Sequence, residues 1–132
     1  MRALLDTNVL VSMPDVVVQE IDRYRASTVS RAELEFGVSA AALRGQEQIA
    51  TMRRLRLDAL DDAGIWLPFD ARASREYGAA AARVLAGGAV ASRARHKDGL
   101  IAAHALALEA PVMTYNVADL ERLGVRVLLP PA

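Results

Sequence analysis

Residues 1–10 read MRALLDTNVL, and the change of polarity inside this stretch indicates the fold. An apolar run ends abruptly at Asp6, Thr7 and Asn8, after which apolar residues resume. A short continuous apolar run bounded by polar residues is typical of a strand that is buried on both faces of a parallel sheet. The stretch therefore predicts a strand over residues 2–5 with a carboxylate at its end.

The rest of the chain alternates apolar runs with segments of helical periodicity. Further strands are expected at 27–29, 65–69, 111–114 and 125–129, and helices at 15–25, from 30 onward, at 46–62, 72–87, 98–109 and 118–123. Strands that alternate with helices predict an α/β fold with helices on both sides of a mostly parallel sheet of about five strands. Because no repeat, linker or low-complexity tract interrupts the pattern, we expect a single domain over residues 1–132.

The composition excludes several classes of site. The chain of 132 residues has no cysteine, which rules out disulfides, zinc-thiolate sites and a cysteine nucleophile. It has 16 basic and 16 acidic residues, so the balanced charge gives no general sign of nucleic-acid binding but leaves it open. No segment has the length and apolarity of a signal peptide or a membrane span, and we therefore expect a cytoplasmic protein without membrane contact.

Polar residues that could carry chemistry stand where strands end or helices begin. Asp6 follows the first expected strand, and Asn116 and Asp119 follow the fourth. Glu33 lies early in the helix after the second strand, and Asp98 opens a helix that is apolar almost all round. Ligands of open parallel α/β sheets bind outside the carboxyl ends of the strands, so residues at these ends are expected to converge.

Each of these acids also has a purely structural interpretation. Asp6 could cap a helix that begins at Thr7, and Glu33 could complete a capping box with Ser30. Asp98, however, is followed at helical spacing by apolar residues, so it faces inward, where an unpaired carboxylate is costly. Carboxylates that converge on a sheltered place repel one another, and a divalent cation with oxygen ligands is the simplest remedy.

Four segments together resemble a known family. LLDTNVLVS, TVSRAELEFGV, KDGLIAAHA and TYNVADLERLGVRVL, in this order and over nearly the whole chain, resemble the PIN domain and most closely the VapC-type toxins of bacterial toxin-antitoxin pairs. The resemblance implies a three-layer α/β/α fold and an endoribonuclease that uses Mg²⁺ or Mn²⁺ held by acids at the strand ends. It also implies an RNA substrate, a VapB-type antitoxin that blocks the site with a basic side chain, and a homodimer.

The resemblance assigns the metal to three acids, which are Asp6, Glu33 and Asp98. It places Thr7, Asn8 and Thr114 beside these acids as supporting polar residues. The family's fourth position, often an aspartate, is Asn116 here, and Asp119 stands three residues further on. Asparagine can offer an oxygen but brings no charge. The alternative is therefore a catalytically impaired PIN-like module that binds RNA or protein without cutting it.

The segment just before Asp98 is the expected RNA-binding element. Its basic residues are Arg93, Arg95, His96 and Lys97. A second basic cluster at 53–56 is interpreted as a solvated helix face, because charge runs on helices usually are. We expect His104, inside the apolar helix, to be a core residue, and Asp70 to be the N-cap of the helix at 72–87.

Overall fold

Five short parallel strands form the centre of the fold in the computed structural model, which describes residues 1–87 and 93–131, with side chains in the second range from residue 96 onward. The strands are β1 (Ala3–Leu5), β2 (Tyr24–Ser27), β3 (Trp66–Leu67), β4 (Val112–Met113) and β5 (Val127–Leu128). Their order in the sheet is β3-β2-β1-β4-β5, and every neighbouring pair is parallel. The parallel α/β sheet predicted from the sequence is thus confirmed.

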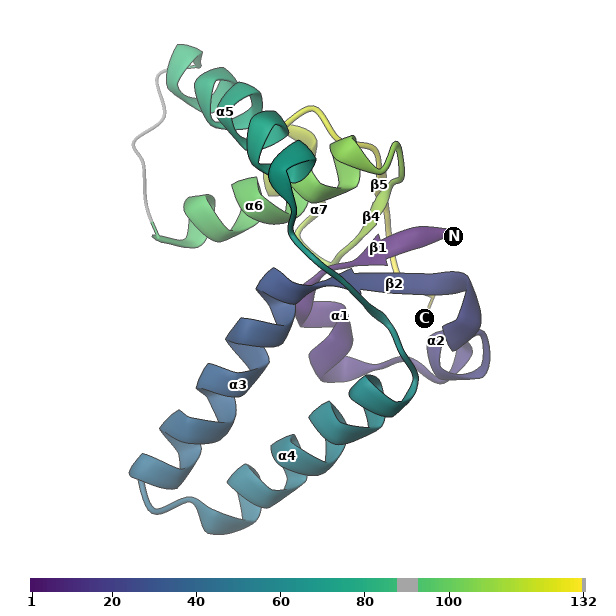
Figure 1. Cartoon of the computed structure of the whole chain (residues 1–132), viewed down its shortest axis with the longest axis vertical. Coiled ribbons are helices and arrows are strands. Elements are labelled where there is room, and N and C mark those ends of the chain that lie inside the picture. The colour runs from purple at the N-terminus through teal and green to yellow at the C-terminus, as the bar shows by residue number, and fades with distance from the viewer. Residues whose placement is uncertain (88–92, 132) are drawn as a thin grey trace.

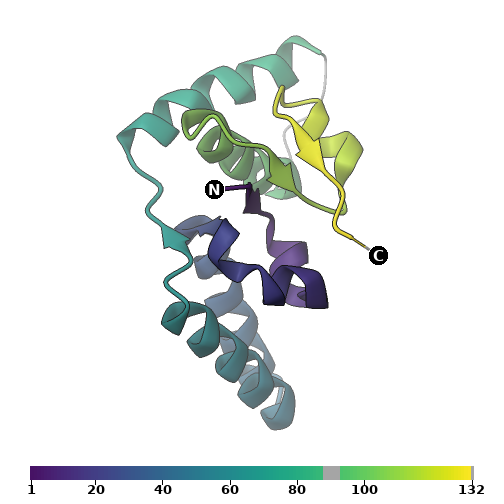
Figure 2. The same cartoon turned by 90° about the vertical axis from the view of Figure 1, so that its right-hand side faces the viewer.

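Helices cover both faces of this sheet. They are α1 (Thr7–Ser12), α2 (Asp15–Gln19), the 3₁₀ turn η1 (Ile21–Arg23), α3 (Thr28–Leu43), α4 (Glu47–Asp62), α5 (Ala71–Ala86), α6 (Arg93–Ala107) and α7 (Val117–Glu121). In Figures 1 and 2, α3 and α4 form one projecting pair on one side of the sheet, and α5, α6 and α7 lie on the other. Among the residues that the structure describes, no helix is long and apolar enough to cross a membrane.

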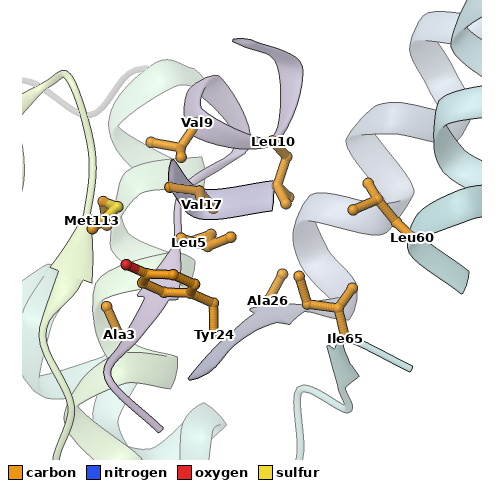
Figure 3. Packing of buried hydrophobic residues seen from close by; sticks show 10 residues of the cluster. All are labelled: Ala3, Leu5, Val9, Leu10, Val17, Tyr24, Ala26, Leu60, Ile65 and Met113. Atoms are coloured by element: carbon orange, nitrogen blue, oxygen red, sulfur yellow. The ribbon is translucent and has the colours of Figure 1, made fainter. Parts of the chain in front are cut away.

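Strand β1 separates two hydrophobic cores. Ala3 and Leu5 belong to one core, and Leu4, which points the other way, belongs to the second. The first core includes α1, α2 and α4 side chains and contains the ring of Tyr24 (Figure 3). The second lies against α6 and α7. Both faces of β1 are fully buried, and this explains why the run before Asp6 is apolar at every position instead of alternating with polar residues.

The segment between α2 and α3 differs from the structure predicted from the sequence, and that prediction was wrong. The helix expected over 15–25 ends at Gln19, and the second strand is Tyr24–Ser27 rather than 27–29. Tyr24 pairs with Ala3 of β1 and is fully buried, so tertiary pairing overrides the helical pattern. The remaining expected elements lie within a few residues of the observed ones, although the strands are shorter.

The cap of α3 also differs from the expected one. Ser27, not Ser30, is the N-cap, and its Oγ accepts a hydrogen bond from the backbone N–H of Val29 at 3.1 Å. Ser30 lies inside the helix, buried, and its Oγ accepts from the Thr7 hydroxyl at 2.9 Å. The earlier helix start puts Glu33 in the second turn of α3 instead of the first.

This cap gives a first testable prediction. Ser27→Ala is expected to lower the free energy of unfolding by about 1 kcal/mol, because it leaves a helix N-terminal N–H without its acceptor. Ser39→Ala, the same change at an exposed position within α3, is the matched control and should be neutral or slightly stabilising. Urea unfolding followed by circular dichroism measures both variants, and equal stability of the two would contradict the assignment of the cap.

Candidate functional site

Asp6 is the most constrained of the candidate acids. It stands between β1 and α1 as the N-cap of α1, and it is only 6% exposed. Its Oδ1 accepts from the backbone N–H of Thr7 at 2.8 Å, and its Oδ2 accepts from the Thr114 hydroxyl at 2.7 Å. Burial raises the pKa of Asp6, and these two hydrogen bonds oppose the rise. The carboxylate is therefore held in one orientation at the edge of the sheet.

A small polar network fixes the groups around Asp6. Thr114 follows β4, the strand next to β1, and is fully buried. Besides donating to Asp6, its hydroxyl accepts from the backbone N–H of Asn116 at 2.9 Å and from Nδ2 of Asn8 at 3.3 Å. The carboxyl ends of β1 and β4 are thus tied together. Strand order reverses at this point of the sheet, which is where ligands of doubly wound sheets bind.

A cleft of about 350 Å³ opens above this network, and all five candidate catalytic residues line it: Asp6, Glu33, Asp98, Asn116 and Asp119. Its lining is Asp6, Thr7, Asn8, Val11, Glu33, Lys97, Asp98, Ile101, Asn116 and Asp119. These residues come from α1, α3, α6, α7 and the strand ends, so their convergence is a product of the fold. Fold topology thus brings together acids that lie up to 113 positions apart, from 6 to 119.

The acids in the cleft repel one another. The pKa of Asp98 is raised to about 6, first by burial and then by the negative charges of Asp6, Asp119 and Glu33. Burial also raises the pKa of Glu33, with a further contribution from Asp6, while the positive charge of Lys97 lowers it. The cleft therefore favours the binding of positive charge.

Lys97 supplies part of that charge. Its Nζ lies 3.8 Å from Oε2 of Glu33, and its side chain is 53% exposed, so the pair is loose. Lys97 lines the cleft together with the acids. Of the basic segment predicted to bind RNA, which is the first part of α6, Lys97 thus lies beside the acids.

The donor set suits a hydrated divalent cation. All the donors are oxygens, as Mg²⁺ and Mn²⁺ prefer, and Asp6 is oriented in advance. Within the described residues, no three histidine, cysteine or carboxylate groups stand close enough to enclose an ion. The residues therefore fit an ion that keeps several waters and contacts one or two carboxylates, and they do not form a closed protein cage.

The other residues predicted to bind RNA are Arg93, Arg95 and His96, and the structure describes the side chain of His96 alone among them. The side chains of Arg93 and Arg95 lie outside the described part of the chain, so their expected contact with RNA remains a prediction. His96 is exposed near the start of α6, and its Nδ1 is hydrogen-bonded to the hydroxyl of Tyr77 on α5. The two rings meet edge to face, with centroids 5.3 Å apart. His96 is thus held by an aromatic neighbour.

Sequence reasoning missed the role of Tyr77. Its ring packs on the backbone of Gly99, where a Cβ would lie 3.1 Å from the ring. The glycine directly after Asp98 was the available signal for a close approach at this point, because a larger residue would displace the ring.

The three arginines of α4 that were expected on a solvated helix face bind groups of neighbouring helices, although Arg53 and Arg56 are also exposed. Arg54 makes a bidentate pair with Glu35, while Arg53 donates to the carbonyl of Gly37 and Arg56 to that of Val11. They join α4 to α3 and α1, and Arg53 and Arg56 line a groove next to the acid cleft, whereas none of the three lines the cleft itself.

Asp70, before α5, and His104, in α6, have the structural roles predicted for them. Asp70 caps α5, since its Oδ1 accepts from the N–H of Ala73 at 3.0 Å. His104 is buried, as expected of a core residue, and packs edge to face on Phe69, but its Nδ1 has no hydrogen-bond partner among the residues that the structure describes.

A parallel sheet covered on both faces, with acids in a cleft beside its central strand, agrees with the three-layer α/β/α fold that the resemblance to the PIN domain implies. No protein-family model matches the sequence. The chain is 35% identical over 138 aligned residues to the VapC ribonuclease Y4jK of Sinorhizobium fredii, and the alignment covers 96% of each of the two chains. At this identity and coverage the chain belongs to the VapC ribonuclease family.

Solved structures agree with this assignment. VapBC-5 of Mycobacterium tuberculosis, a member of the VapBC family of toxin-antitoxin systems, is 29% identical, with a TM-score of 0.76 over 99% of this chain and 98% of its own. VapBC2 of Rickettsia felis, bound to a promoter DNA fragment, has a TM-score of 0.77 over 99% of this chain and 100% of its own. At 22% identity the second match supports the fold alone.

Proposed function

We propose that this protein is a Mg²⁺-dependent endoribonuclease and the toxin of a toxin-antitoxin pair. The observation that carries the proposal is the convergence of Asp6, Glu33, Asp98 and Asp119 on one cleft beside the central strand. The curated relative, named a VapC ribonuclease, supports RNA as the substrate. Mn²⁺ would suit the same oxygen donors.

Asp6 and Asp98 are the proposed primary metal ligands, with Glu33 beside them. Bound Mg²⁺ would relieve charge on the scissile phosphate, activate the attacking water and stabilise the leaving oxygen. Thr7 and Thr114 keep the Asp6 carboxylate in place, so little reorganisation is needed during the reaction. We expect products with 5′-phosphate and 3′-hydroxyl ends.

Glu33 is the proposed acceptor of the proton from the attacking water. It is partly buried and lines the same cleft as Asp6 and Asp98, the proposed metal ligands. Lys97, 3.8 Å from Glu33, would contact a nonbridging phosphate oxygen once RNA enters. His96 would contact the RNA further along the strand, and Arg93 and Arg95 belong to the same basic segment.

Asn116 does not by itself argue for a non-cutting module. Its backbone N–H is bound to Thr114, and Asp119, one helical turn away on α7, lines the same cleft. The cleft therefore still contains four carboxylates, with Asp119 providing the charge that Asn116 lacks. We propose that Asn116 orients water or a ligand and that Asp119 adds charge to the site.

The proposed partner is a VapB-type antitoxin. The comparison structures include VapBC complexes, and a groove of about 400 Å³ between α3 and α4 adjoins the acid cleft at Thr7, Glu33 and Lys97. Leu34, Ile49 and Met52 give this groove an apolar lining. An antitoxin segment lying there could place a basic side chain among the acids. A homodimer is proposed from the family resemblance alone.

Cleavage assays with purified protein test the enzymatic proposal. Structured RNAs incubated with Mg²⁺ should be cut at defined positions, and excess chelator should abolish the cuts, which mapping of the 5′ ends will reveal. Cleavage that persists in excess chelator would rule out metal dependence, whereas RNA binding without cleavage would favour the impaired module. Growth arrest on expression, relieved by the antitoxin, tests the toxin role separately.

A further inference from the structure

A second cavity adjoins the acid cleft on its α5 and α7 side. It has a volume of about 390 Å³, and its lining is Arg83, Val84, Gly87, Asp98, Asp119, Arg122 and Leu123. It shares Asp98 and Asp119 with the acid cleft, so the two hollows meet at these carboxylates. A strand of RNA lying across the acids would therefore continue from one hollow into the other.

Arg83 is held over this cavity by backbone atoms. Its Nη1 donates to the carbonyl of Leu123 at 2.9 Å, and its guanidinium lies against Gly124. A Cβ at Gly124 would come within 3.1 Å of Nη1, and the φ of +83° also favours glycine there. None of the ion pairs among the described residues includes Arg83, and its guanidinium has further N–H donors for a ligand.

Arg122 adds a second guanidinium to the same cavity. Its Nη1 lies 3.7 Å from Oδ1 of Asp119, and the two side chains are 69% and 58% exposed. So exposed a pair contributes little to stability and separates readily. Arg122 can therefore turn from Asp119 to an incoming anion, particularly when Asp119 engages a cation in the neighbouring cleft.

We propose that the cavity between Arg83 and Arg122 binds a phosphate of the substrate RNA, next along the strand from the phosphate at the acids. This inference rests on the proposed function, because it places the scissile phosphate in the acid cleft. Guanidinium groups bind phosphate oxygens through paired N–H donors, and a guanidinium fixed in advance loses less entropy on binding. Contacts to phosphate position the strand without reading its sequence.

Binding of single-stranded RNA tests the proposal in an Asp6→Asn background, where cleavage does not interfere. Arg83→Met retains much of the packing while removing the charge. It is expected to weaken binding of oligo(A) and oligo(U) equally, by about tenfold, for one lost charged hydrogen-bonding contact. A plot of log affinity against log salt concentration has a negative slope, which should become shallower by about 0.7 for each phosphate contact that is lost. Arg122→Met should act in the same direction, and the double variant should lose more.

Arg75→Met is the matched control, since Arg75 is an exposed arginine of α5 outside the cavity. It should leave affinity and salt slope unchanged. Unchanged affinity and slope in Arg83→Met, or losses matched by the control, would overturn the proposal. Cleavage of RNA by the wild-type protein is scored separately, so a failure of the proposed function is distinguished from a failure of the phosphate site.

Discussion

Replacing Asp6 with asparagine is expected to lower the rate of RNA cleavage by about two to three orders of magnitude, the loss typical of removing a preorganised electrostatic contact in an active site. The amide keeps an oxygen that can accept from the Thr7 N–H, so the cap of α1 survives. It removes the negative charge, however, and its NH₂ group cannot accept the hydrogen bond from Thr114. A cation in the cleft then loses its best oriented ligand.

The control for this variant is Asp70→Asn. Asp70 also caps a helix through a hydrogen bond to a backbone N–H, but it is exposed and lies outside the cleft. Initial rates on a labelled RNA at several Mg²⁺ concentrations measure both variants, and circular dichroism checks that they are folded. Cleavage by Asp6→Asn at the wild-type rate, with unchanged Mg²⁺ dependence, would remove Asp6 from the proposed metal site.

The central part of the fold could be predicted because its sequence signals are local and consistent. The apolar run before Asp6 is a buried strand, and the apolar helix that follows Asp98 packs against it in the second core. Strand β2 could not be placed, since its residues read as the end of a helix until pairing with β1 is known. The correct cap, Ser27, depends on where that strand ends.

The candidate site, like the fold, could be predicted only where the signal lies in the local sequence. Strand ends converge in any parallel sheet, so Asp6, Asn116 and Asp119 could be grouped from order along the chain. Glu33 and Asp98 reach the cleft from helices. Their order along the chain and the inward face of Asp98 indicated the same edge of the sheet, and the family resemblance then assigned both to one metal site with Asp6. The cavity at Arg83 could not be predicted, because it depends on a hydrogen bond between α5 and the loop after α7, 40 positions apart.

Asp98→Asn is expected to stabilise the protein at pH 7.5 in the absence of divalent cations, even though it should impair cleavage. The pKa of Asp98 is raised from 3.8 to about 6, so between these values the folded protein binds more protons than the unfolded chain. Stability therefore falls as pH rises through this interval, and the full cost is present above about pH 6. Asparagine carries no charge and escapes that cost.

The expected gain at pH 7.5 is about 1–2 kcal/mol, since water at the partly open cleft screens some of the repulsion. Urea unfolding in chelator at pH 7.5 and pH 4.5 measures it, and the gain should shrink at the lower pH. Asp22→Asn, an exposed acid outside the cleft, should change stability by less than about 0.5 kcal/mol at either pH.

Mg²⁺ should reduce the stability difference between Asp98→Asn and the wild-type protein in the same experiment. A cation that binds the folded state stabilises it by mass action, and the wild-type cleft should bind the ion more tightly than the Asp98→Asn cleft. The difference in unfolding free energy should therefore narrow as Mg²⁺ is added at pH 7.5. A gain that is independent of both pH and Mg²⁺ would show that Asp98 affects packing alone. A gain that responds to both ties the destabilising charge of the cleft to the ion that it is proposed to hold.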